Sequence, residues 1–202
     1  MNARRHREDG FTVIEVAIAS ALLLVILASL LSALTNLTNA DVRAQALANN
    51  GDQVRTVAIQ VARDIRASNP LMANDSVTGH TISANEVILT SGPSTGSQTV
   101  IAWRYDAAAH TLSRCVRALS GAPVTCTTAL KKVNVSSAAP VFQYFCSSAA
   151  ELNPANANGP ADIAKAGVRV RVTLDAAPQS GPAALPIQED AELRNQPGAT
   201  GC

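Results

Sequence analysis

The strongest constraint on the fold is a long apolar run near the beginning of the chain. From Phe11 to Leu34 the sequence reads FTVIEVAIASALLLVILASLLSAL, in which Glu15 is the only ionisable residue. As an α-helix rising about 1.5 Å per residue, this run would be roughly 36 Å long. The hydrocarbon core of a bilayer is about 30 Å thick, so the run predicts a tilted transmembrane helix. The arginines within residues 1–10 precede it, which predicts a cytoplasmic N-terminus.

Two simpler interpretations of this run are a secretory signal peptide and a plain signal anchor. A signal peptide also starts with basic residues, but its apolar core usually has only about 7–15 residues. A signal anchor explains the length of the run. Neither explains Glu15, because a carboxylate inside a membrane helix costs about 2.5–3.5 kcal/mol on insertion scales. A residue of this kind usually has a partner and a function.

Cleavage of the chain after Gly10 would provide that partner. The new N-terminus would be the amine of Phe11, and Glu15 would lie about one helical turn away. The carboxylate would then reach this amine in its own chain or the amine of a neighbouring subunit.

The segment from Gly10 to Glu15, GFTVIE, opens the apolar run, and the rest of the predicted apolar helix follows it. It resembles the cleavage and methylation motif of type IV prepilins, which type IV pilins share with type II secretion pseudopilins. The resemblance implies that a prepilin peptidase removes residues 1–10, that Phe11 is N-methylated and that Glu15 guides assembly.

The helix is expected to continue past the membrane to residue 68, because no proline occurs between Phe11 and Asn69. Its second half has apolar residues at helical spacing, which predicts a stripe packed on the protein's own sheet. A stripe kept for neighbouring subunits is the alternative. A kink or frayed point is predicted at residues 49–52, where Gly51 disfavours helix. The apolar stripe consists of Val54, Val57, Ala58, Val61 and Ile65.

Beyond Pro70, short β-rich segments alternate with turn residues, which predicts antiparallel strands. The expected fold class is therefore α+β, with a long N-terminal helix, transmembrane and then amphipathic, packed on an antiparallel β-sheet domain. Ser91–Ser97 and Asn153–Ala161 are predicted loops. The predicted strands are Glu86–Thr90, Thr99–Tyr105, Thr111–Leu119, Val124–Val133, Val141–Cys146 and Gly167–Leu174. The predicted parts are a cytoplasmic leader (1–10), the transmembrane half of the helix (11–38), its soluble amphipathic half (39–68), an extracytoplasmic β domain (69–176) and a flexible C-terminal tail (177–202).

Two further segments carry a finer resemblance. Ile101–Asp106 leads through a short turn to Thr111–Arg114, and Val61–Arg66 ends the helix. Both resemble segments of J-type minor pseudopilins and PilW-like minor pilins. The resemblance implies a position near the filament tip and a role in starting assembly. The alternative is that Trp103 and Tyr105 serve packing alone.

Four cysteines, Cys115, Cys126, Cys146 and Cys202, all follow the apolar run, which fits an exported domain with two disulfides. If Ser120-Gly121 is a two-residue hairpin turn, Cys115 lies opposite Cys126, with Cα atoms about 4.5 Å apart. Cys146 and Cys202 would then tie the C-terminus to the sheet. Free thiols and metal ligation remain alternatives, although no cysteine pair has the short spacing of a zinc site.

No enzyme motif stands out. The chain has no His-Glu-x-x-His pair, no phosphate-binding glycine loop and no nucleophile elbow, and His80 and His110 are expected to be isolated surface residues. The net charge of +1 gives no reason to expect nucleic-acid binding. We therefore expect neither an enzyme nor a cofactor or metal.

The expected function is that of a minor pilin or pseudopilin of a type IV pilus or a type II secretion pseudopilus. Expected partners are prepilin peptidase/methyltransferase, other pilin or pseudopilin subunits, the inner-membrane assembly platform and membrane lipid. The expected location is the inner membrane, crossed once, with an extracytoplasmic C-terminal domain, and a filament after assembly. The alternative is a membrane-anchored extracellular binding module that does not polymerise.

Overall fold

The computed structural model describes residues 12–92, 98–121, 123–131, 133, 140–156, 158–176 and 185–193. The chain divides into two compact units, Met1–Ala46 and Leu47–Cys202. The first helix, α1 (Val13–Ala67), begins in the first unit and ends in the second. Its end lies one residue before the predicted one.

In the first unit, α1 carries an almost unbroken apolar surface. Its large apolar side chains, from Val13 to Val42, are all exposed. The hydroxyl groups of Ser20 and Ser29 donate back to helix carbonyls, over 2.9 and 2.7 Å. Such bonds satisfy polar groups that an apolar solvent would leave without partners. By length and composition, α1 is long and apolar enough to cross a membrane.

Helical structure continues without a break through residues 49–52, so the frayed point predicted there is wrong. A glycine costs only about 1 kcal/mol in a helix interior. The tertiary burial of the apolar stripe just after Gly51 outweighs that cost, since packing of an amphipathic face supplies most helix stability in proteins.

The second unit is built from antiparallel sheets, so the α+β prediction is confirmed. A five-stranded sheet has the order β1-β4-β5-β6-β7, a four-stranded sheet the order β11-β10-β8-β9, and β2 pairs with β3. The strands of the first sheet are β1 (Asn69–Leu71), β4 (Glu86–Ser91), β5 (Thr99–Asp106), β6 (Thr111–Ala118) and β7 (Thr125–Lys131). The others are β2 (Asn74–Asp75), β3 (His80–Thr81), β8 (Phe142–Phe145), β9 (Glu151–Leu152), β10 (Arg169–Ala176) and β11 (Leu185–Glu192).

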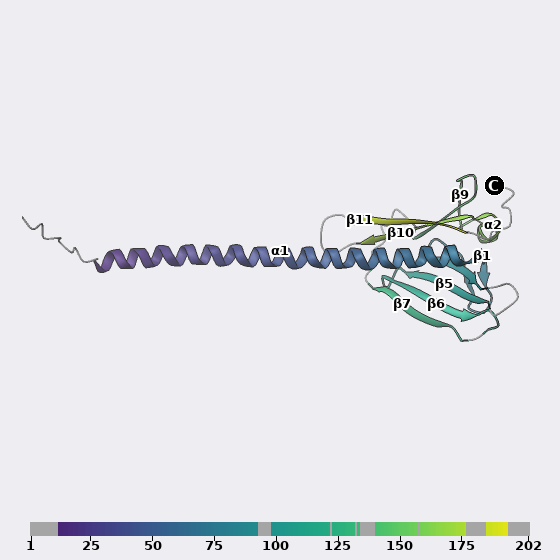
Figure 1. Ribbon diagram of the computed structural model, residues 1–202, viewed down its shortest axis with the longest axis horizontal. Coiled ribbons are helices and arrows are strands. Elements are labelled where there is room, and N and C mark those ends of the chain that lie inside the picture. The colour runs from purple at the N-terminus through teal and green to yellow at the C-terminus, as the bar shows by residue number, and fades with distance from the viewer. Residues whose placement is uncertain are drawn as a thin grey trace, which may run out of the picture. The chain divides into compact units, whose positions relative to one another are not determined.

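The predicted apolar stripe is confirmed as part of the core. All five of its residues are buried, and Ala62 adds to them. The C-terminal half of α1 has β5, β6 and β7 on one side and β10 and β11 on the other (Figure 1). Asp64 bonds to the five-stranded sheet, and Arg66 donates to the Asp190 carbonyl of the four-stranded sheet over 2.9 Å. The stripe therefore packs on the protein's own sheets.

The two larger sheets meet at the start of β8. The backbone N–H of Phe142 donates to the carbonyl of Ala84 over 2.9 Å. The hydroxyl of Tyr144 lies 3.0 Å from the Ser83 carbonyl and 2.8 Å from the Glu86 carbonyl. Burial raises the pKa of Tyr144 well above its usual value, so the phenol stays protonated as the donor.

All six predicted strands are present, and none of their ends is shifted by more than two residues. The flexible tail predicted for residues 177–202 is wrong for residues 185–192. These residues form β11, which pairs with β10 in unbroken register from Arg169↔Glu192 to Ala176↔Leu185. Pro186 is compatible with this strand because β11 lies at the edge of its sheet.

The loop predicted at Asn153–Ala161 is also partly wrong, because a short helix, α2 (Gly159–Ala166), starts within it. Proline at the start of α2 suits the first turn of a helix, and Ile163 is buried. Of the loop predicted at Ser91–Ser97, residues 93–97 lie outside the described residues.

Candidate assembly and stabilising sites

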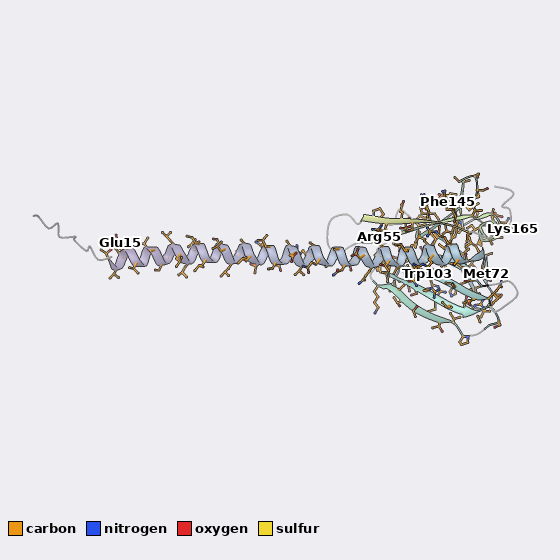
Figure 2. The ribbon with its side chains drawn as sticks, viewed as in Figure 1. Glu15, Arg55, Met72, Trp103, Phe145 and Lys165 are labelled. Atoms are coloured by element: carbon orange, nitrogen blue, oxygen red, sulfur yellow. A yellow bond between two sulfur atoms is a disulfide. The ribbon has the colours of Figure 1, made fainter. Side chains whose placement is uncertain are left out.

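Glu15 lies in the first turn of α1, at the N-terminal end of the described chain (Figure 2). Its Oε2 accepts from the backbone N–H of Thr12 and from the Thr12 hydroxyl, each over 3.0 Å. The N–H of Glu15 in turn donates to Thr12 Oγ1 over 3.4 Å. This reciprocal arrangement is a capping box, which gives donors and acceptors at the start of a helix their partners.

The capping box fixes the direction of the Glu15 carboxylate. Both donors of Thr12 bind Oε2, and within the described residues no hydrogen bond reaches Oε1. Oε1 can therefore accept a hydrogen bond from a donor outside the described residues. The predicted cleavage site, Gly10 and Phe11, lies outside the described residues, so the proposed partner amine stays a prediction.

A second polar cluster joins α1 to the hairpin of β5 and β6. Asp64 Oδ2 accepts from the indole N–H of Trp103 over 2.9 Å and from Arg114 Nε over 2.8 Å. The guanidinium of Arg114 also lies 6.0 Å from the centre of the Trp103 ring. The helix-end segment and the hairpin segment that the sequence singled out therefore meet in space, at one carboxylate.

The aromatic residues of this hairpin are packing residues. Trp103 is fully buried and Tyr105 is 8% exposed. The Tyr105 hydroxyl donates to the Val133 carbonyl over 3.2 Å and lies 3.4 Å from His110 Nδ1. His80 Nδ1 lies 3.4 Å from the carboxylate of Glu86, which also pairs with Arg104. Neither histidine is therefore isolated, contrary to expectation.

The predicted Cys115–Cys126 disulfide is confirmed, with Cα atoms 4.0 Å apart. The two cysteines are directly opposite each other in the β6–β7 ladder, as the predicted register requires. The predicted turn is wrong, because β6 ends at Ala118 and the Gly121 N–H donates to the Ala118 carbonyl. Gly121 has a φ of +95°, which favours glycine, and the longer connection preserves the register.

The second predicted disulfide is not tested. Cys146 is buried, and its sulfur lies 3.1 Å from Ser148 Oγ and 3.4 Å from the Ala150 carbonyl oxygen. Cys202 lies outside the described residues, so the Cys146–Cys202 bond stays a prediction.

A buried ion pair that the sequence did not reveal joins β2 to β6. The side chains of Asp75 and Arg117 are each 3% exposed, and they form a bidentate ion pair. Arg117 Nε donates to Asp75 Oδ2 over 2.9 Å, and Arg117 Nη2 donates to Oδ1. Arg117 Nη1 donates to the Ala118 carbonyl over 2.9 Å. The Arg117 hydrogen bonds lower the pKa of Asp75 to about 2.

Within the described ranges, no three His, Cys, Asp or Glu side chains are arranged as a metal site. The polar clusters above hold elements of the fold together, whereas Glu15 presents an acceptor that the described residues leave open. Compared with known proteins, the chain matches no family model, and no curated protein matches it by sequence.

Proposed function

We propose that this chain is a minor pilin or pseudopilin, cleaved after Gly10, methylated at Phe11 and assembled into a type IV pilus or type II secretion pseudopilus. The observation that carries the proposal is the GFTVIE segment at the start of a long apolar helix. A plain membrane anchor needs the apolar helix but has no use for a carboxylate at Glu15.

The form of α1 supports this proposal. Its membrane-length apolar surface and the apolar stripe belong to one helix, Val13–Ala67. The stripe is covered by the protein's own sheets, whereas the apolar side chains from Val13 to Val42 are exposed. Lipid would cover them before assembly, and helices of neighbouring subunits would cover them in a filament.

The capping box at Thr12 and Glu15 supports the assembly role of the carboxylate. After cleavage, the amine of Phe11 would be a cation beside an acceptor whose Oε2 is already occupied. Oε1 would accept from that amine or from the amine of a neighbouring subunit. In the low dielectric of a membrane, this pairing offsets the cost of inserting the carboxylate.

The proposed topology has residues 1–10 in the cytoplasm and the β domain outside the inner membrane, because the basic residues precede the apolar run. The proposed partners are prepilin peptidase/methyltransferase, other subunits and the inner-membrane assembly platform. A position near the tip rests on the resemblance of Val61–Arg66 and the hairpin to J-type pseudopilins. The contact of Asp64 with Trp103 and Arg114 gives those segments a common structural role.

The Glu15→Val variant tests the assembly role. The protein is produced in cells that carry the prepilin peptidase and the assembly machinery, and immunoblots compare sheared filaments with membranes. We expect normal membrane insertion and a loss of about tenfold or more from the filament fraction. Asp41→Asn, on an exposed carboxylate of the same helix, is the matched control and keeps wild-type incorporation.

Equal incorporation of Glu15→Val and wild type would contradict the assembly role of Glu15. If the wild-type protein itself stays wholly in the membrane fraction, the alternative of a membrane-anchored binding module that does not polymerise is favoured.

A further inference from the structure

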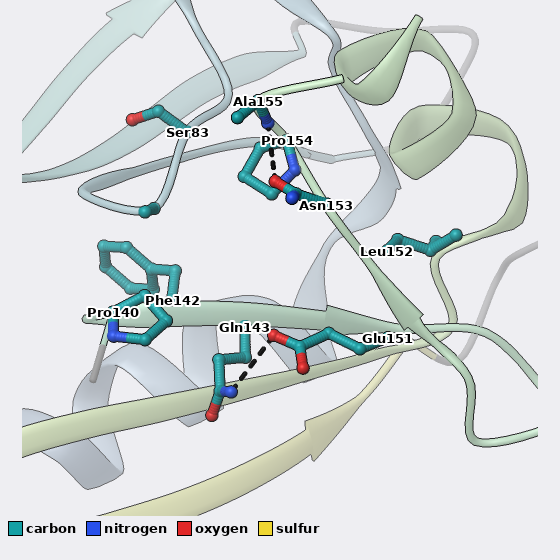
Figure 3. A pocket seen from close by; sticks show the side chains of 10 residues that line it. Ser83, Pro140, Phe142, Gln143, Glu151, Leu152, Asn153, Pro154 and Ala155 are labelled. Atoms are coloured by element: carbon teal, nitrogen blue, oxygen red, sulfur yellow. Dashed lines mark hydrogen bonds between the residues drawn. The ribbon is translucent and has the colours of Figure 1, made fainter. Parts of the chain in front are cut away.

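The second unit contains a cavity of about 600 Å³ where the two larger sheets meet. Three segments line it: the turn at residues 83–84 before β4, residues 140, 142 and 143 at the start of β8, and residues 151–155 in β9 and the loop after it (Figure 3). None of the functions considered above uses this pocket.

The pocket exists because the pairing of β9 with β8 stops early. The ladder contains only Tyr144↔Leu152 and Phe145↔Glu151. Continued in the same register, Pro154 would lie opposite Phe142, but proline has no N–H to donate. The N–H of Phe142 bonds to Ala84 instead. The carbonyl of a strand residue points to the same side as its N–H, so the Phe142 carbonyl faces the pocket without a strand partner.

The loop on the other side of the pocket is held in place. Asn153 Oδ1 accepts from the Ala155 N–H over 2.9 Å, which closes a local turn. Gly159, at the start of α2, touches this loop so closely that an added Cβ would lie 2.3 Å from the Asn153 carbonyl oxygen. The pocket is therefore largely formed before any ligand binds, which lowers the entropic cost of binding.

Among the described residues that line the pocket, Glu151 is the only charged one. Its Oε1 accepts from the neutral amide of Gln143 over 3.1 Å, and no ion pair involves this carboxylate within the described residues. The nearby cation Arg171 interacts electrostatically with Glu151, but its hydrogen bonds go to Asp190, over 2.8 and 3.0 Å. The pocket thus offers a carboxylate and a backbone carbonyl as acceptors, and none of its described lining residues is basic.

The walls of the pocket are mostly apolar, with the ring of Pro140 on one side and that of Pro154 on the other (Figure 3). Lysine and arginine side chains combine an apolar stem with a cationic head that only donates hydrogen bonds. An anion would be repelled by Glu151, and a fully apolar group would remove the carboxylate from water without a partner. We propose that this pocket binds a lysine or arginine side chain presented by a partner polypeptide. The proposal does not depend on filament assembly.

The test uses the full chain in neutral detergent and ligand-observed saturation-transfer NMR. The probes are acetylated, amidated tripeptides Gly-Xaa-Gly in which Xaa is Lys, Arg, Gln or Glu. We expect saturation transfer to the side-chain protons of the Lys and Arg peptides, and at least tenfold weaker binding of the Gln and Glu peptides. A charge-assisted hydrogen bond accounts for a difference of this size.

Two variants locate the binding site, and one variant is the matched control. Glu151→Gln should weaken binding of the Lys peptide about tenfold. Ala155→Trp, which fills the pocket from an exposed lining position and keeps the carboxylate, should abolish it. Glu192→Gln removes an exposed carboxylate that does not line the pocket and should leave binding unchanged. Thermal unfolding confirms that each variant is folded.

The proposal is overturned if the Lys and Gln peptides bind equally well, or if no peptide binds. It is also overturned if Glu192→Gln weakens binding as much as Glu151→Gln, because binding would then follow the net charge. Persistent binding by a folded Ala155→Trp variant would place the peptide elsewhere.

Discussion

The ion pair of Asp75 and Arg117 is expected to contribute measurably to the stability of the β domain. Its side chains are each 3% exposed, and Arg117 also bonds to the Ala118 and Leu119 carbonyls. In the Asp75→Asn variant, the guanidinium stays buried beside a neutral amide. Removal of one partner of a buried ion pair typically costs about 3–5 kcal/mol. We expect a loss of this size in the free energy of unfolding.

The pH dependence of the unfolding free energy gives an independent value for the stability that the ion pair contributes. The pKa of Asp75 is lowered from 3.8 to about 2 in the folded protein. A shift of nearly two units corresponds to about 2 kcal/mol of stability. This stability is fully present above the unfolded pKa of about 4 and is lost as the pH falls towards 2. Asp75→Asn removes this titration, so the difference in stability between wild type and variant should shrink by about 2 kcal/mol between pH 5 and 2.

The assay is urea unfolding of the full chain in neutral detergent, followed by the fluorescence of Trp103, which is the only tryptophan and is fully buried. The matched control is Asp190→Asn, whose partner is Arg171. That pair is exposed, with side chains 33% and 40% accessible, so we expect a loss below about 1 kcal/mol.

A double variant distinguishes the effect of the unpaired buried charge on stability from the effect of altered packing at the site. Arg117→Met in the Asp75→Asn background removes the buried unpaired cation and should restore part of the lost stability. The reasoning is refuted if Asp75→Asn costs less than about 1 kcal/mol, or if its stability follows the wild-type pH dependence down to pH 2.

The remaining predictions concern the β6–β7 hairpin and the loop that borders the pocket. Replacing Cys115 and Cys126 together with serine should lower the free energy of unfolding by about 3 kcal/mol, measured by urea unfolding, because the bond closes a loop with a sequence separation of 11. Non-reducing peptide mapping should join these two cysteines, and a different link would contradict the β6–β7 register. Gly159→Ala would bring a Cβ to 2.3 Å from the Asn153 carbonyl, so thermal unfolding should show a loss of about 1–3 kcal/mol. The same variant should weaken the Lys-peptide signal; an unchanged melting temperature would count against the close approach.

The helix and the main strands could be predicted because their patterns are periodic. The apolar stripe follows helical spacing, and Val170, Val172 and Leu174 alternate with polar residues along β10. The Cys115–Cys126 pairing was predicted from a two-residue turn at Ser120-Gly121. That turn is wrong, but the register it implied is the one found in the β6–β7 ladder.

The amino-acid composition of β11 did not predict a strand. Its inward positions include Glu189 between Ile187 and Ala191, and Pro186 is a residue that usually ends strands. The long strand β10 nevertheless pairs with it along its whole length, so tertiary context decided its structure. Local composition alone therefore described this segment wrongly as a tail.

Some of the site contacts likewise had a pattern in the sequence, and others had none. The capping box was present in the sequence as Thr12 three residues before Glu15, a pattern that the apolar context made easy to overlook. The pairing of Asp75 with Arg117 had no such signal, because β2 has only two residues and the partners are 42 positions apart. Contacts of this kind depend on how the strands are arranged, which sequence periodicity does not encode.

The central claim is that the chain is a processed prepilin-like subunit, and the N-terminus of the mature protein tests it most directly. Tandem mass spectrometry of the protein purified from cells with a prepilin peptidase should find a chain that starts at Phe11 and carries one N-methyl group. An N-terminus at Met1, or one near Leu34 produced by signal peptidase, would contradict the claim.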